Sequence, residues 1–218
     1  TPRPLNILLL KGGTSAEREV SLLSAANVAN ALREAGHHVE EYDIQKLEVT
    51  DAMRRADVVF PVLHGGFGED GRIQELLEKE GIPFVGPSSQ ACRLIMDKFS
   101  SKQIMNRVGV LNPAYAVVDD LRAPVPPHLK LPLIVKPNSE GSTFGLSLVE
   151  SPEEWIPALR KALDYGRTVL VEEYVRGTEA TIGILLGQAL PMIEIRYPGK
   201  LYDYDAKYTH AHGETQYL

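Results

Sequence analysis

The chain has very little cysteine. Cys92 is the one cysteine among 218 residues, so no disulfide can form within the chain, as is usual in a reducing compartment. Two other patterns are lacking. No apolar run is long enough to span a membrane, and the first residues carry no signal-peptide pattern. We therefore expect a cytoplasmic protein with no membrane partner.

Positive charge is also scarce relative to negative charge. The chain has 23 Lys and Arg against 29 Asp and Glu, a formal net charge of −6 at pH 7. Nucleic-acid-binding proteins favour basic surfaces, so we expect no nucleic-acid partner. With 44% hydrophobic and 24% charged residues, the composition is that of an ordinary globular protein of one large or two small domains.

Strand-like and helix-like segments alternate along the first part of the chain. This alternation predicts an α/β fold with a parallel sheet. Thr14 and Glu17 stand at capping-box spacing, which predicts the start of the first helix. The glycine-rich segments 11–15 and 64–71 each follow a strand, so they should lie at the carboxyl edge of the sheet, where functional loops gather. Each also fits a plain turn, and His64 also fits a structural histidine. The expected strands are residues 6–10, 39–44, 57–63 and 82–85.

The pattern changes in the second half of the chain. Residues 119–132 are rich in proline, which indicates a surface connection and a subdomain boundary. Beyond it, Ser151 and Glu154 form a capping box with proline at the first helical position. We expect a mostly antiparallel sheet backed by this helix. The expected helices are residues 91–108 and 151–165, and the expected strands are residues 110–118, 133–135, 146–149, 168–174, 181–185 and 189–195.

The segment LIVKPNSEGSTFGLSLV, residues 133–149, carries the strongest chemical signal. A short strand leads to Lys136, and a loop rich in glycine and hydroxyl groups, 138–145, leads back into a strand. Backbone N–H groups, hydroxyls and a lysine are suitable donors to a triphosphate. The lysine precedes the loop and a strand follows it, so this is not a Walker loop. A hairpin with a polar turn and an edge lysine is the alternative.

Several motifs together resemble the D-alanine–D-alanine ligase family. They occur in the family's order and span nearly the whole chain. The family has the ATP-grasp fold, which implies an N-terminal α/β domain at 1–92, a central subdomain at 93–177, and the start of a C-terminal domain at 178–218 that includes a tyrosine-rich loop. The motifs are GGTSAEREVS at 12–21, LHG at 63–65, GEDG at 68–71, MDK at 96–98, KP at 136–137, EGS at 140–142 and YDYDAKY at 202–208.

The resemblance implies ATP-dependent joining of two D-alanines into the dipeptide used for peptidoglycan. The first D-alanine carboxylate attacks the γ-phosphorus of ATP, and the amine of the second attacks the resulting acylphosphate. Mg²⁺, with Mn²⁺ as the alternative, would screen the repulsion between carboxylate and triphosphate. The implied nucleotide-binding residues are Lys98, Lys136 and Lys207 at the phosphates, Glu140, Gly141, Ser142 and Thr143 in the phosphate loop, Glu172, Glu173, Tyr174 and Val175 at the adenine edge, and Glu179 at the ribose.

The resemblance also implies a binding site for the first D-alanine. Glu17 matches the group that holds its ammonium, and His64 matches a second contact. Ser142 and Tyr208 match residues that hydrogen-bond with Glu17 and complete the pocket, so Glu17, Ser142 and Tyr208 are the implied catalytic residues. Exclusion of water would protect the acylphosphate. The aromatic Tyr208 also points to a dipeptide rather than a D-lactate ester.

The chain departs from the family in length. The family runs on past the match to Leu218, and that further part should carry the metal ligands and the second D-alanine pocket. We therefore expect no metal site within these residues and no catalysis by the 218-residue chain alone. Smaller departures are Thr143, where a second serine is usual, and Phe144, where a small residue is common. By analogy with the family, a homodimer would form through the N-terminal domain.

Two other functions remain open from the sequence. Another ATP-grasp carboxylate–amine ligase would share the features at 133–149 and 168–179 but would not need the 12–21 motif or the tyrosine loop. The other is a non-catalytic nucleotide-binding or interaction module, for which the 218-residue chain would be the real product.

Overall fold

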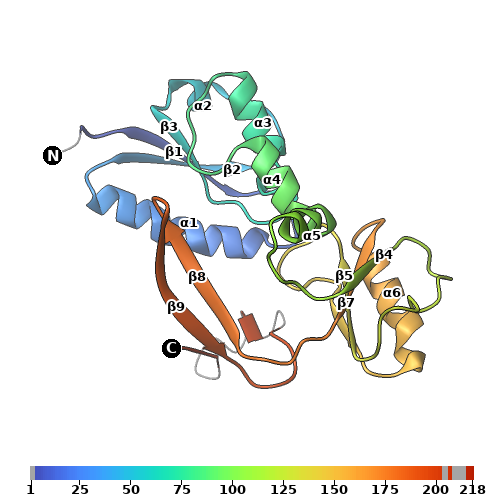
Figure 1. The fold of residues 1–218 in the computed structure, drawn as a ribbon. Coiled ribbons are helices and arrows are strands. Elements are labelled where there is room, and N and C mark those ends of the chain that lie inside the picture. The colour runs from blue at the N-terminus through green and yellow to red at the C-terminus, as the bar shows by residue number, and fades with distance from the viewer. Residues whose placement is uncertain (1–2, 203–205, 208–214) are drawn as a thin grey trace. The chain divides into compact units, whose positions relative to one another are not determined.

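The computed structural model describes residues 3–202, 206–207 and 215–218. The chain divides into two compact units, Thr1–Ile104 and Met105–Leu218, whose elements are labelled in Figure 1. Within the described residues, no helix combines the length and the apolar character that crossing a membrane requires.

The first unit is built on a parallel sheet, as the strand–helix alternation predicts. Strands β1 and β3 lie side by side, with β2 on the other side of β1. The expected strand at 82–85 is reduced to a single bridge between Val59 and Phe84. The elements are β1 (Asn6–Gly12), α1 (Arg18–Glu34), β2 (His38–Ile44), α2 (Asp51–Arg55), β3 (Val58–Pro61), the 3₁₀ turn η1 (Gly66–Gly68), α3 (Arg72–Lys79) and α4 (Ser89–Met96).

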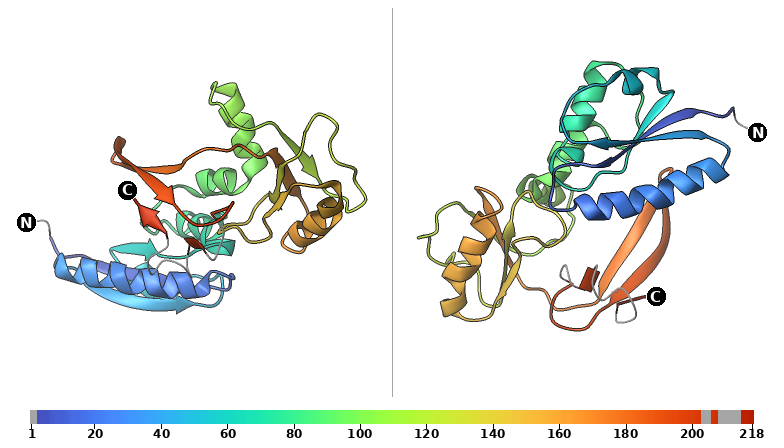
Figure 2. Two further views of the ribbon diagram at one scale, coloured as in Figure 1. Left: turned by 90° about the horizontal axis from the view of Figure 1, so that it is seen from below. Right: turned by 180° about the vertical axis from the view of Figure 1, so that it is seen from behind.

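Helices cover both faces of this sheet, because successive side chains of a strand point to opposite faces. Leu9 of β1 packs against Ala25 and Ala29 of α1. Leu8 and Leu10 point the other way and join a separate cluster with residues of α2 and α3. Figure 2 shows α1 running along one side of β1 and β2. The continuous apolar run in β1 is therefore buried on both sides, which fixes where its carboxyl end lies.

The single helix expected over 91–108 is wrong. The chain forms α4 and then α5 (Lys98–Arg107), with a break at Asp97. Asp97 has an extended backbone, and its carboxylate accepts a hydrogen bond of 2.7 Å from the Ser100 amide. A side chain that caps a new helix in this way interrupts a helical run. The break places Lys98 in the first turn of α5.

The second unit contains an antiparallel sheet of four strands with the order β4-β7-β5-β6. Its helix, α6, packs on one face, as Figure 2 also shows. The strand expected at 110–118 is shorter than predicted, because it begins only at Tyr115. The elements are β4 (Tyr115–Val118), β5 (Leu133–Pro137), β6 (Ser147–Val149), the 3₁₀ turn η2 (Pro152–Glu154), α6 (Trp155–Leu163) and β7 (Val169–Glu173).

The capping box predicted at Ser151 and Glu154 is confirmed. Glu154 accepts a hydrogen bond from the Ser151 amide at 3.2 Å. Trp155, which follows directly, is buried and donates from Nε1 to the Ala123 carbonyl at 2.8 Å. The start of the helix is thereby joined to the proline-rich connection.

The remaining strands form a sheet of their own rather than continuing the first. Strands β8 (Glu179–Leu185) and β9 (Gln188–Arg196) make a hairpin, and β10 (Gln216–Tyr217) pairs with the end of β9. Leu186 and Gly187 form the predicted turn with φ of 50° and 78°. The one mostly antiparallel sheet expected for this half is therefore two sheets.

Candidate functional site

Glu17 and His64 lie at the carboxyl edge of the first unit's parallel sheet, where the sequence predicted the D-alanine site. Ser15 joins their segments, since its hydroxyl accepts a hydrogen bond from the Glu17 amide at 3.1 Å and donates to the His64 carbonyl at 2.5 Å. Glu17 is buried, with only 5% of its surface exposed. A Cβ atom added at Gly65 would lie 2.7 Å from the Glu17 carboxylate oxygen. The two glycine-rich motifs therefore build one site around a carboxylate.

His64 contributes a buried polar atom to this site. Its Nε2 is buried and makes no hydrogen bond with any residue that the structure describes, while its Nδ1 lies 3.8 Å from Glu69. Glu69 also accepts a hydrogen bond from the Gly65 amide at 2.9 Å. A buried nitrogen without a partner is costly, so this atom is suited to a polar ligand.

The capping box predicted at Thr14 and Glu17 is wrong. Helix α1 begins at Arg18, and Glu17 stands at its N-cap without a side-chain capping bond. The carboxylate faces Gly65 instead, so a site contact has replaced a helix cap.

Two further side chains stabilise this edge of the sheet, and neither was predicted from the sequence as a site residue. Ser21 is fully buried, accepts a hydrogen bond from the Gly12 amide at 2.8 Å and donates to the Val62 carbonyl, so it joins the ends of β1 and β3. Arg18 forms a two-pronged pair with Asp43 at 2.8 and 2.5 Å. This hydrogen-bonded ion pair holds the pKa of Asp43 below its usual value. A serine within a helix and a distant ion pair give no local sequence signal.

Asp43→Asn is expected to lower the free energy of unfolding at neutral pH. The depressed pKa of Asp43 means that the pair with Arg18 stabilises the fold above the unfolded-state pKa of about 3.9. That stabilisation is lost as the pH falls through the lower folded-state pKa. Urea unfolding across this range should show the difference from wild type shrinking in acid, with exposed Asp119→Asn as the control. A difference independent of pH would contradict this assignment.

The first unit also supplies Lys98, at the start of α5. One turn further along, Lys102 is buried, with 7% of its surface exposed. Residues four apart lie on the same face of a helix, so two lysines share one stripe of α5. Lys102 was not predicted as a site residue, because a lysine within a helix usually lies in solvent.

In the second unit, Lys136 projects from the face of the sheet opposite α6. Leu133 and Val135 of β5 point into the core with α6, so Lys136 points to the other face. Its ammonium forms an ion pair with Glu172, whose side chain is only 8% exposed. The pairing of β5 with β7 sets Ile134 opposite Glu172 and thereby puts Glu172 on the same face as Lys136. The sequence placed both residues at a nucleotide but did not predict this pair.

The loop after β5 has the strained backbone of a ligand-binding loop. Ser142 and Thr143 have φ of 45° and 63°, which is uncommon for residues other than glycine. A side chain at Gly145 would lie 2.7 Å from Pro137 and 2.9 Å from Tyr165, so only glycine allows this close packing. The amides of Gly141 and Thr143 donate no hydrogen bond within the described residues. These amides are therefore available to an anion beside Lys136.

The segment expected at the adenine edge leaves one backbone donor for a base. The Glu173 and Tyr174 amides already bond to the carbonyls of Ala114 and Pro132 at 3.0 and 3.1 Å. Val175 follows with 66% of its surface exposed, and its amide donates no hydrogen bond to the backbone of the described residues. Of the expected residues, Val175 is thus the one whose N–H can reach a ligand.

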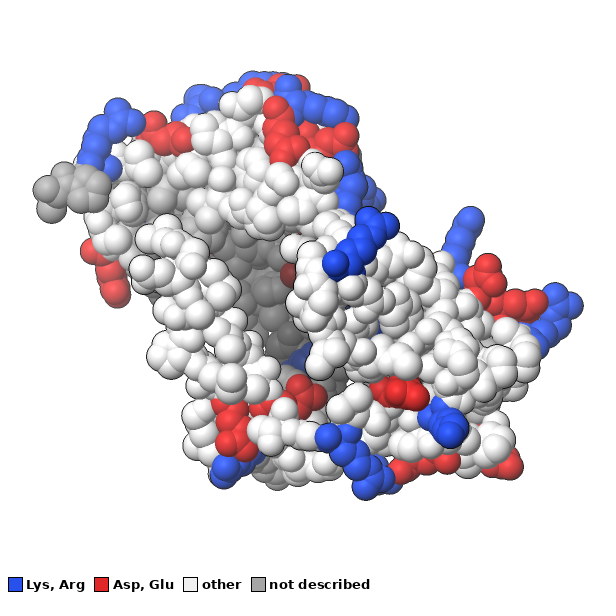
Figure 3. Space-filling model, viewed as in Figure 1, with Lys and Arg blue, Asp and Glu red and all other residues white. Residues whose placement is uncertain are grey.

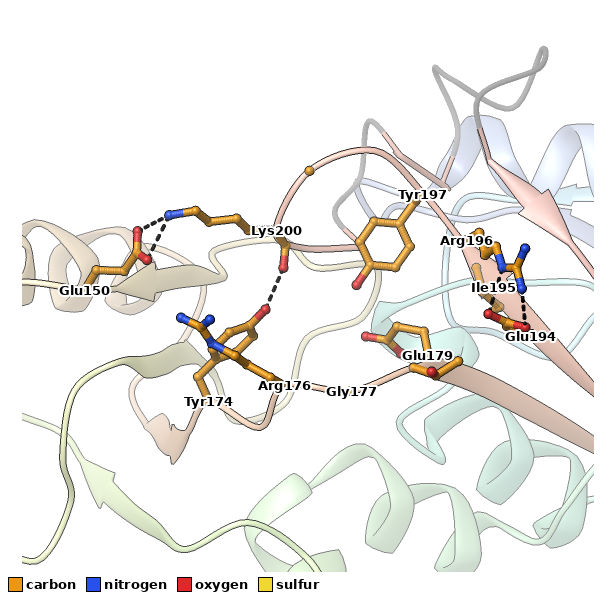
Figure 4. Close-up of a pocket in the computed structure, with 12 residues that line it drawn as sticks. Glu150, Tyr174, Arg176, Gly177, Glu179, Glu194, Ile195, Arg196, Tyr197 and Lys200 are labelled. Carbon is orange, nitrogen blue, oxygen red and sulfur yellow. Dashed lines mark hydrogen bonds and ion pairs between the residues drawn. The ribbon is translucent and has the colours of Figure 1, made fainter.

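A pocket of about 640 Å³ lies beside this segment, between the ends of β7, β8 and β9. Figure 4 shows Glu179 and Tyr197 facing one another across it. On another wall, Lys200 donates to both Glu150 oxygens at 2.8 and 2.6 Å, and the Tyr174 hydroxyl donates to the Lys200 carbonyl at 3.0 Å. Glu179, expected at the ribose, therefore lines a cavity of suitable size for part of a nucleotide.

Lys207 is described, and its ammonium lies 5.3 Å from the ring centroid of Tyr202. Tyr208, expected to complete the D-alanine pocket, lies outside the described residues, and its expected role stays a prediction. The expected hydrogen bonding between Ser142 and Glu17 also stays a prediction, because these residues belong to different units.

Metal-ligating side chains do not gather in the described part of the chain, where no three His, Cys, Asp or Glu residues could jointly hold an ion. Charges of both signs are interspersed on the face shown in Figure 3, and neither sign forms a continuous patch there.

Comparison with known proteins gives one consistent family. The family described as "D-ala D-ala ligase N-terminus" matches residues 38–87, and "D-ala D-ala ligase C-terminus" matches residues 108–218. The D-alanine–D-alanine ligase of Haemophilus ducreyi is 41% identical over 217 residues, covering 97% of this chain and 71% of that protein. That of Anaeromyxobacter dehalogenans is 44% identical over 224 residues, covering 97% of this chain and 70% of that protein.

Solved structures agree with the sequence comparison. D-alanine–D-alanine ligase of Bacillus anthracis complexed with ATP matches with a TM-score of 0.83 and 27% identity, covering 98% of this chain and 70% of that one. D-alanyl-alanine synthetase A of Vibrio cholerae matches with a TM-score of 0.79 and 25% identity, covering 100% of this chain and 74% of that one. The fold is therefore the ATP-grasp fold that the motifs implied, and the chain belongs to the D-alanine–D-alanine ligase family of ligases.

Proposed function

We propose that this chain binds ATP and D-alanine for the joining of two D-alanines into D-alanyl-D-alanine, a peptidoglycan precursor. The observation that carries the substrate assignment is the buried Glu17 carboxylate beside Gly65, next to a His64 Nε2 atom without a partner among the described residues. A carboxylate suits an ammonium group, and a ring N–H suits a carboxylate. A small amino acid presents both groups.

The nucleotide side of the proposal is supported by three features. Lys136 lies at the end of β5, directly before the strained loop with available amides. We assign the phosphates to this loop, to Lys136 and to Lys98 and Lys207. We assign the base edge to the Val175 amide, with Glu172, Glu173 and Tyr174 holding that segment in place. The ribose hydroxyls are assigned to Glu179.

In the proposed reaction, an oxygen of the first D-alanine carboxylate attacks the γ-phosphorus of ATP, and ADP leaves. The amine of the second D-alanine then attacks the carbonyl carbon of the acylphosphate, and phosphate leaves with the loss of a proton from the new amide. The lysines lower the barrier to the first step because they neutralise charge that repels the attacking carboxylate. Glu17 and His64 fix the orientation of that carboxylate.

Several finer assignments belong to this proposal. Mg²⁺ would accompany ATP, but we assign it no ligand, since no metal-binding group of three occurs among the described residues. The domain division at 1–92, 93–177 and 178–218 and a homodimer through the first domain rest on the family resemblance. A cytoplasmic location rests on the cysteine usage.

Calorimetric titration with ATP, followed by small amino acids in the ATP-bound state, tests the function. We expect D-alanine to bind, and L-alanine and D-lactate to bind about 10-fold more weakly or not at all. L-alanine inverts the arrangement of the groups that the site contacts, and D-lactate replaces the ammonium by a hydroxyl. Binding of a different amino acid in preference would indicate another ATP-grasp ligase. ATP binding without any amino acid would indicate a nucleotide-binding module.

A further inference from the structure

Tyr197 lies beside Glu179, the residue proposed to bind the ribose. It is the residue after β9, and its hydroxyl points toward Glu179 across the pocket in Figure 4. Burial of the phenol and the negative charge of Glu179 raise the pKa of Tyr197. The phenol is thus a neutral donor that can hold the Glu179 carboxylate in one orientation.

The ring of Tyr197 makes a second connection. Its centroid lies 5.1 Å from that of Tyr202, with the planes tilted by 33°. The ammonium of Lys207 lies 5.3 Å from the Tyr202 centroid, within the range of a cation–π contact. A series of contacts therefore runs from Tyr197, which faces Glu179, through the ring of Tyr202 to Lys207.

The segment that carries these two rings is held by the strand before it and by contacts of Lys200 within it. Strand β9 precedes it, and Lys200 is held by Glu150 and by Tyr174. Lysine has many side-chain conformations, and their restriction before a ligand binds reduces the entropy lost on binding. An aromatic face fixed in this way can restrict Lys207.

We infer that Tyr197 is a positioning residue with two contacts. Its hydroxyl orients the carboxylate of Glu179, which is assigned to the ribose, and its ring acts through Tyr202 to orient Lys207, which is assigned to the phosphates. This inference rests on the proposed function. It assigns Tyr197 a role in recognising both the ribose and the phosphates, although Tyr197 itself need not touch the nucleotide.

Two variants separate the hydroxyl from the ring. Tyr197→Phe keeps the stack on Tyr202 and removes the donor to Glu179, so ATP affinity should fall about 5-fold, while affinity for 2′,3′-dideoxy-ATP should stay at the wild-type value. Tyr197→Leu also removes the stack. The preference for ATP over adenosine should then fall about 5-fold further. Calorimetry with the three ligands measures both effects.

Tyr42→Phe is the matched control, because it removes a tyrosine hydroxyl from β2 of the first unit, and Tyr42 does not line this pocket. It should bind all three ligands as wild type does. Equal losses for all ligands in Tyr197→Phe would show a merely structural role and overturn the inference, as would wild-type affinities in both variants. Failure of the wild-type protein to bind ATP would overturn the proposed function and this inference with it.

Discussion

Gly65→Ala is expected to weaken D-alanine binding strongly while ATP binding survives. Gly65 has φ of 63°, and an added Cβ would lie 2.7 Å from the Glu17 carboxylate and 3.3 Å from Ser15. The carboxylate must then move, because the backbone at Gly65 is tied to Glu69 at 2.9 Å. An ammonium group positioned by that carboxylate would lose its partner, which should weaken D-alanine binding about 100-fold. Calorimetry in the ATP-bound state measures this loss.

Gly81→Ala is the control for an alanine at positive φ. Gly81 has φ of 66°, almost the same as Gly65, but an added Cβ would meet nothing within 4 Å. The variant should lose about 1 kcal/mol of stability from the left-handed backbone alone and should bind D-alanine as wild type does. Normal D-alanine binding by Gly65→Ala would show that Glu17 does not hold this substrate.

Lys136→Met is expected to reduce ATP affinity about 100-fold, because the variant loses the cation beside the phosphate loop. It should also destabilise the fold. Glu172, with a side chain only 8% exposed, would lose its ion pair with Lys136, at a cost of about 3 kcal/mol. Calorimetry with ATP and urea unfolding measure the two effects separately.

A double variant distinguishes binding from folding. Lys136→Met/Glu172→Gln removes both charges, so it should recover most of the lost stability but none of the ATP affinity. Lys130→Met, which replaces an exposed lysine, should change neither. Recovery of ATP affinity in the double variant would show that Lys136 acts on the fold alone.

Local patterns predicted much of the fold correctly. The apolar run of β1, the Ser151–Glu154 capping box and the Leu186–Gly187 turn are each determined by neighbours in sequence. The break at Asp97 was missed, because both sides of it have helical patterns and the cap forms only when the Asp97 side chain turns to Ser100.

The site was predicted less completely, because its contacts are distant in sequence. The motifs located Glu17, His64 and Lys136. They could not show that Glu17 faces Gly65 instead of forming a capping box. Nor could they show that Lys136 pairs with Glu172. The position of Tyr197 opposite Glu179 was equally hidden. Each of these depends on which strands are neighbours, and no local periodicity encodes that arrangement.

Lysines and loop amides of this chain are proposed to neutralise the phosphates of a nucleotide, and the other assignments depend on this interaction. Calorimetric titration of the wild-type protein with ATP and with adenosine tests it most directly. The account predicts that ATP binds at least about 100-fold more tightly than adenosine. Equal affinities for the two ligands would contradict it.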